Sequence, residues 1–100
     1  MIYALLMAAA TASLPKSIWV MGQGTDSCAS AFRADNYSRT TEWVAGYFTG
    51  INSGWGGSVG QTTDMYGIMG EIKLICDAEP SNTLIGAAAR VYIKLKQQHR

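Results

Sequence analysis

The chain has 100 residues, of which 48% are hydrophobic and 15% are charged. This length accommodates one domain, and the composition excludes an intrinsically disordered chain or a charged coiled coil. Eight basic residues against seven acidic residues give a net charge of +1, so no overall field favours nucleic acid as a partner.

Residues 1–12 form an almost continuous apolar run, which is typical of the central part of a secretory signal peptide. Ala10-Thr11-Ala12 matches the A-x-A pattern that precedes a cleavage site. No basic residue precedes the run, and a buried or membrane-lying N-terminal helix is the alternative. A spanning helix needs about 20 apolar residues, and Pro15 and Lys16 interrupt this run too early. We therefore expect cleavage after Ala12, export to the periplasm, and no stable membrane insertion after the leader is removed.

Residues 13–25 show no sustained period and contain one proline and two glycines. We expect a loose N-terminal arm here, with Trp19 packed against the core. A short first helix is predicted to begin at Asp26 or Ser27, since both are good N-cap residues. Its apolar face would contain Cys28, Ala31 and Phe32. Residues 35–38 (D-N-Y-S) have the composition of a turn.

The clearest helical pattern is a stripe of aromatic and aliphatic residues in the middle of the chain. The stripe consists of Trp43, Val44, Tyr47, Phe48 and Ile51. Gly46 and Gly50 form a G-x-x-x-G pair on this helix, and we expect these small residues to let another helix approach closely. Residues 52–64 hold four glycines and are predicted to end the helix.

Two further helices follow, and no segment alternates apolar and polar residues for long enough to predict a strand. The third helix is predicted from about Met65 to Ala78, where Pro80 stops it. The fourth is predicted to start at Ser81 or Asn82, and its apolar face would contain Leu84, Ile85, Ala88, Val91, Tyr92 and Leu95. Residues 26–100 are therefore predicted to form an all-α domain of three or four helices.

The motifs that would indicate an enzyme, a cofactor site or a metal site are missing from the sequence. The glycine-rich residues 54–62 match neither the phosphate-binding P-loop nor the dinucleotide fingerprint, and no strand precedes them. The single histidine, His99, lies next to the last position, in what we expect to be a fraying tail, so it is not expected to activate a serine or cysteine nucleophile. The acidic residues show no pairing pattern. We predict no catalytic residue, no cofactor, no metal ion and no nucleic-acid partner.

The two cysteines, Cys28 and Cys76, are separated by 48 positions. In an exported protein the default expectation is a disulfide between them, which would close the domain. The alternative is a pair of reduced core cysteines in a cytosolic protein.

These features together resemble the HdeA/HdeB family of periplasmic acid-stress proteins. The resemblance rests on a cysteine at the start of a helix, a central helix rich in Trp, Tyr and Gly (residues 43–52), and a second cysteine just before an acidic-proline break (residues 76–80). It covers most of residues 26–97. It implies a small helical fold closed by Cys28–Cys76, a chaperone that binds acid-unfolded clients, and storage as a homodimer.

We expect the surface that binds a client or partner to contain Trp43, Tyr47, Phe48, Ile51 and Trp55. Ordinary core packing is the competing interpretation of these residues, because stripes at helical spacing usually face inward. A second hypothesis is an exported binding or immunity-type protein, which would use the same aromatic helix to cap one specific folded partner. Dependence on acid would favour the chaperone, and a stable complex at neutral pH would favour the folded partner.

Overall fold

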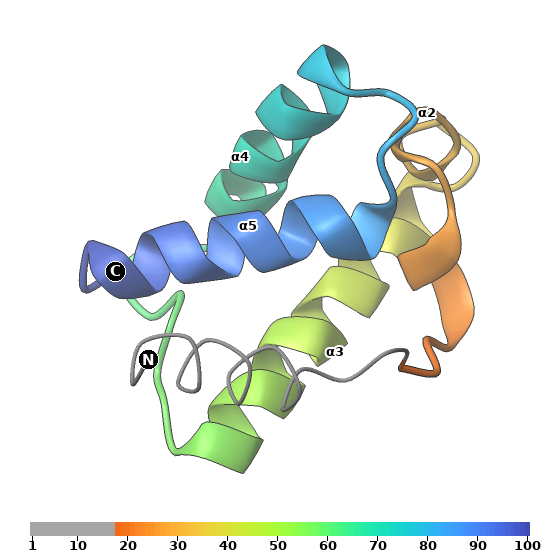
Figure 1. The fold of residues 1–100 in the computed structure, drawn as a ribbon. Helices are drawn as coiled ribbons and strands as arrows, with labels where there is room; N and C mark the ends of the chain where they lie inside the picture. The colour runs from red at the N-terminus through yellow and green to blue at the C-terminus, as the bar shows by residue number, and fades with distance from the viewer. Residues whose placement is uncertain (1–17) are drawn as a thin grey trace, which may run out of the picture.

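The computed structural model describes residues 18–100, so the predicted signal peptide and its cleavage point lie outside the described residues. The described chain contains five helical elements and no strand (Figure 1). They are η1 (Gly22–Thr25, a 3-10 turn), α2 (Cys28–Ala31), α3 (Tyr37–Trp55), α4 (Met65–Ala78) and α5 (Leu84–Gln97). The predicted all-α fold is confirmed.

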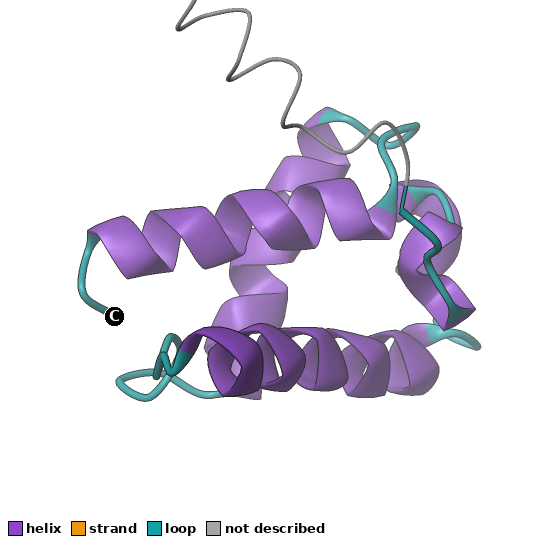
Figure 2. Cartoon of the chain, turned by 60° about the horizontal axis from the view of Figure 1, so that its bottom comes forward, coloured by secondary structure: helices purple, strands orange, loops and turns teal. Residues whose placement is uncertain are grey.

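The helices α3 and α5 both begin on the side of the domain where α2 lies and diverge from there (Figure 1), and α4 crosses behind them in the view of Figure 2. Apolar side chains from all of these helices meet in one core. Its largest fully buried members include Met69 and Ile72 of α4, Leu84 and Leu95 of α5, and Val44 of α3. The core therefore lies where α4 crosses the other two helices.

Three helices begin at a side chain that caps a free backbone N–H group. Ser27 Oγ accepts from Ser30 N at 3.1 Å, Asp64 Oδ1 accepts from Gly67 N at 2.9 Å, and Thr83 Oγ1 accepts from Gly86 N at 3.1 Å. Such a cap stabilises a helix by about 1 kcal/mol. The expected start at Ser27 and the expected limits of α4 agree with these positions.

The helix α3 is longer at both ends than its sequence pattern predicts. It begins at Tyr37, inside the segment predicted to be a turn, and it continues through Gly54 to Trp55. It stops where Gly56 adopts a left-handed conformation with φ of 70°, and the Gly56 N–H donates to the Asn52 carbonyl. Glycine favours this conformation because it has no Cβ to clash.

The helix α5 starts at Leu84, two or three residues later than predicted, because the preceding residues are engaged by α2. The Asn82 carbonyl accepts from Cys28 N at 2.7 Å, and Asn82 Oδ1 accepts from Thr83 N at 2.8 Å. Thr83 is extended and pairs with Ser27 in an isolated bridge. These contacts hold residues 82 and 83 out of the helix.

The described part of the N-terminal arm includes the 3-10 turn η1 and packs against α3, but not through its own tryptophan. Trp19 is 90% exposed, which corrects the expectation that it packs against the core. Instead Trp43 of α3 lies over the 3-10 turn η1, and its Nε1 donates to the Met21 carbonyl at 2.7 Å. Gly24 is buried beneath this indole: a Cβ there would lie 2.4 Å from Trp43 Cζ2.

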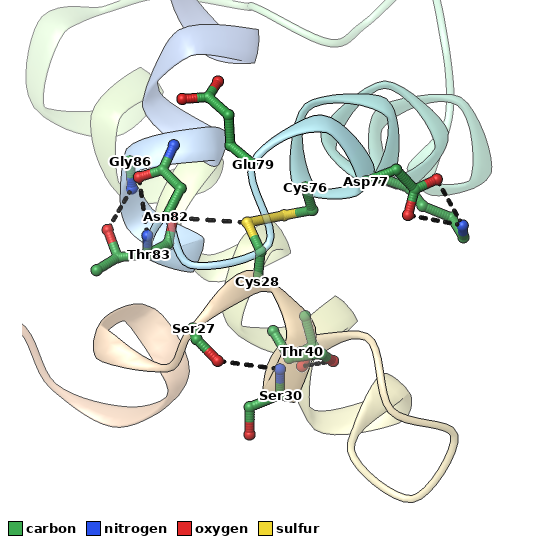
Figure 3. The surroundings of a disulfide bond; sticks show 12 residues. Ser27, Cys28, Ser30, Thr40, Cys76, Asp77, Glu79, Asn82, Thr83 and Gly86 are labelled. Atoms are coloured by element: carbon green, nitrogen blue, oxygen red, sulfur yellow. Dashed lines mark hydrogen bonds and ion pairs between the residues drawn. A yellow bond between two sulfur atoms is a disulfide. The ribbon is translucent and has the colours of Figure 1, made fainter.

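The disulfide predicted between Cys28 and Cys76 is present (Figure 3). It joins α2 to the last turn of α4, with the two Cα atoms 5.0 Å apart, and both residues are buried. Two backbone hydrogen bonds hold α2 at the same place, from Cys28 N to the Asn82 carbonyl and from Ala29 N to the Pro80 carbonyl. The disulfide therefore reinforces a junction that the backbone also forms.

Candidate functional site

One side of α3 presents four large side chains, Trp43, Tyr47, Ile51 and Trp55, spaced by four residues, so they follow one helix face. The first three are half-buried, and Trp55 is 79% exposed. Together they run along α3 for about 18 Å, given a rise of 1.5 Å per residue.

The row faces three residues of α5, Ile85, Ala89 and Ile93, which have the same spacing of four. The two rows line two hollows that share Tyr47 as a common wall. The first, of about 430 Å³, also involves residues 18–21 with Trp43 and Ile85. The second, of about 220 Å³, lies among Ile51, Trp55, Ala89, Ile93 and Lys96. We call this continuous surface the α3–α5 groove.

Phe48, the fifth candidate from the sequence, belongs to the core. It is 4% exposed and packs edge-on against Tyr92 of α5, with ring centroids 5.1 Å apart. It therefore supports the base of the groove and contributes no surface to a partner.

A hydrogen-bond network below the groove fixes the distance between α3, α5 and the glycine-rich loop. The Tyr92 hydroxyl donates to Asn52 Oδ1 at 2.7 Å. The same oxygen accepts from Val59 N at 3.1 Å, and Asn52 Nδ2 donates to the Val59 carbonyl at 3.0 Å. One asparagine thereby ties α3 to α5 and to residues 57–61, which makes the groove a preformed feature of the fold.

At the other end, Trp43 and Tyr47 stack on one another, with ring centroids 5.1 Å apart and an interplanar angle of 13°. Burial of the phenol raises the pKa of Tyr47, and the neighbouring Tyr92 raises it further. Tyr47 offers an aromatic surface with a polar tip.

The Gly46 and Gly50 pair does not contact a helix within residues 18–100, contrary to the close approach expected from the sequence. A Cβ built at either position, or at Gly54 one turn further on, has no atom within 4 Å. Gly46 also lines the larger hollow, so no side chain rises from α3 at this edge of the groove.

Charged residues lie outside the apolar floor of the groove. Glu42 lines the larger hollow at the Trp43 end, and Lys96 lines the smaller hollow at the Trp55 end. Lys96 Nζ lies 5.2 Å from the centroid of the Trp55 ring, a cation–π contact. The two ends of the groove therefore carry opposite charges.

Sequence reasoning identified the α3 side of the groove and missed the α5 side. The sequence pattern places Ile85 on the inward face of its helix and does not single out Ala89, Ile93 or Lys96 as surface residues that face α3. Their regular spacing was the available signal, although spacing on one helix does not show which helix it faces.

No three side chains among His, Cys, Asp and Glu come together as metal ligands within residues 18–100. In the same part of the chain, no helix is both long and apolar enough to cross a membrane. Comparison of the chain with protein-family models, curated proteins and solved structures gives no match.

Proposed function

We propose that this protein is a small exported chaperone that binds apolar segments of other polypeptides in the α3–α5 groove. The observation that carries the proposal is the groove itself: an aromatic row on α3 opposite an aliphatic row on α5, held open by the Tyr92–Asn52 hydrogen bond. Aromatic side chains with a polar tip are effective anchors for protein partners. Location in the periplasm agrees with the disulfide, because disulfides persist in oxidising compartments.

An acid response is the second part of the proposal, and the distribution of charge supports it. Protonation of seven carboxylates and His99 takes the formal charge from +1 to +9 at low pH. Glu71 of α4 forms ion pairs with two basic residues, Lys94 of α5 and Arg100, which follows α5. Its Oε1 lies 2.8 Å from Lys94 Nζ, and its Oε2 lies 3.7 Å from Arg100 Nη1. The increase in net positive charge at low pH raises the self-repulsion of the domain and so loosens its packing, while Cys28–Cys76 keeps α2 joined to α4.

A second candidate function is the capping of one specific folded partner at neutral pH. The preformed groove favours it, because a surface that is already open needs no acid to become available. The two functions differ in their pH dependence. Binding that strengthens below about pH 4, where carboxylates protonate, indicates the chaperone, and a stable one-to-one complex at pH 7 indicates the folded partner.

The test is suppression of aggregation of an acid-unfolded client, followed by light scattering at pH 3 and at pH 7. Two groove variants, Ile93→Gln and Trp55→Gln, are compared with two matched controls on α4, Leu74→Gln and Tyr66→Gln. All four side chains are well exposed, at 54%, 79%, 69% and 86% respectively, so none of these changes opens a cavity. Circular dichroism verifies that each variant is folded.

We expect the wild type and the α4 variants to protect the client at pH 3, and the groove variants to lose most of the protection. An absence of protection by the wild type at equimolar amounts refutes the chaperone. Equal protection by all four variants refutes the groove as the binding surface.

A further inference from the structure

The Trp55 end of the groove leads into a third hollow of about 270 Å³, which has a different chemical character. Its walls are the glycine-rich loop and the end of α5. The lining residues are Gly57, Ser58, Val59, Gln61, Lys96, His99 and Arg100. No acidic side chain is among them, whereas two are cationic and one is a histidine. We call it the cationic pocket.

Lys96 belongs to both the cationic pocket and the smaller hollow of the groove, so it marks the junction between them. None of the ion pairs within residues 18–100 includes Lys96. By contrast, Lys94 and Arg100 both share Glu71. The Lys96 ammonium is held over the Trp55 ring, with its charge uncompensated at the edge of an apolar surface.

The opposite end of the groove carries a negative charge. Glu42 lines the larger hollow there, beside Trp43 and Tyr47, and none of the residues 18–100 that line this hollow is basic. A ligand with a negative charge is therefore favoured at the Lys96 end and disfavoured at the Glu42 end. The groove between the two ends is apolar over about 18 Å, which corresponds to about 12 residues of helix or five to six residues of extended chain.

We propose that the ligand of the groove is an amphipathic polypeptide segment whose apolar side chains lie along α3 and α5 and whose acidic end is bound at Lys96, next to the cationic pocket. This inference rests on the proposed function, since it specifies which apolar segments the groove selects. The carboxylate comes from Asp or Glu side chains, or from the end of a chain. When the ligand is bound, Lys96 keeps its contact with the Trp55 ring and gains an ion pair with the carboxylate.

The size of the effect follows from the exposure of Lys96. Ion pairs at exposed positions contribute modestly and are screened by salt. We expect an acidic end to improve affinity about fivefold at low ionic strength, and the preference to shrink toward twofold or less at about 0.2 M salt. The apolar contacts remain the main source of affinity.

The experiment uses three fluorescein-labelled peptides that share one 12-residue helical segment of alanine, leucine and glutamine. They end in three Asp, three Asn or three Lys residues. Fluorescence anisotropy at pH 7 gives the Kd of each peptide for the wild type and for Lys96→Gln, Lys96→Arg and Lys73→Gln. Lys73 is the matched control, because it lies on α4, outside the groove, and pairs with Asp77.

We expect the Asp peptide to bind most tightly and the Lys peptide most weakly. Lys96→Gln should abolish the difference between the Asp and Asn peptides. Lys96→Arg and Lys73→Gln should both retain the preference.

Three outcomes would overturn the inference, and they separate it from the proposed function. Equal binding of the three peptides refutes the acidic end and leaves the groove as a binder of apolar segments. Failure of every peptide to bind refutes both proposals. If myristate, an apolar chain with one carboxylate, binds in a Lys96-dependent way and the Asp peptide does not, the ligand is a small amphiphile and the polypeptide assignment is wrong.

Discussion

Removal of the disulfide by the double substitution Cys28→Ala and Cys76→Ala should cost most of the stability of the domain. The disulfide closes a loop of 48 positions, which corresponds to about 4 kcal/mol in the chain-entropy treatment of the unfolded state. The native state should survive, because the backbone hydrogen bonds of α2 to Pro80 and Asn82 do not involve the sulfur atoms. A domain of this size has a total unfolding free energy of about 5–10 kcal/mol, so about 1–6 kcal/mol remains after the loss.

Urea denaturation followed by circular dichroism at 222 nm measures this loss. With an m value of about 1.3 kcal/mol per molar urea, the midpoint should fall by about 3 M. Wild type treated with a reductant should show the same midpoint as the double variant, which controls for the substitutions themselves. A decrease of less than about 1 kcal/mol in unfolding free energy would refute the reasoning, because the unfolded chain would then be compact without the cross-link.

Four single substitutions test the packing around the groove. Gly50→Ala should stabilise the domain by about 0.5–1 kcal/mol, since its Cβ meets open space on an exposed helix face. Gly24→Ala should destabilise the domain, because its Cβ would collide with Trp43. Urea midpoints that shift in the same direction for both variants would contradict this reasoning. Tyr92→Phe should cost about 1 kcal/mol through the lost hydrogen bond to α3 and should speed amide hydrogen exchange in residues 57–61; unchanged exchange would separate that loop from the network. The pKa of Tyr47 is raised above 10.0 in the folded state, so folding favours the neutral phenol. This contribution to the unfolding free energy is complete below pH 10 and is lost as the pH rises through the folded pKa. Tyr47→Phe should therefore flatten the decrease in unfolding free energy at alkaline pH.

The helices could be predicted from the sequence where a local signal marks their ends. Asp64 is a good N-cap, and Pro80 limits the chain just after Ala78, so the bounds of α4 follow from local chemistry. The start of α5 could not be predicted in this way, because Asn82 is engaged by Cys28, which lies 54 positions earlier. Contacts between distant segments decide such a boundary.

The surface could be predicted only in part, because periodicity gives the face of a helix and does not say how deeply each residue lies. Phe48 and Trp55 both belong to the surface predicted to bind a client, yet Phe48 is 4% exposed and Trp55 is 79% exposed. The difference arises because α4 and Tyr92 cover the middle of α3 and stop short of its end. Trp19 and Trp43 present the same difficulty: the small Gly24 allows the arm to lie against Trp43, and Trp19 remains outside.

The central claim is that the α3–α5 groove binds apolar polypeptide segments. Nuclear magnetic resonance tests this claim most directly. The backbone amides and indole groups of isotopically labelled protein are followed while the neutral Asn-terminated peptide is added at pH 7. We predict the largest chemical-shift changes at Trp43, Tyr47, Trp55 and Ile93, and none at Tyr66 and Leu74 on α4. Changes concentrated on α4, or no change anywhere at saturating peptide, would contradict the account.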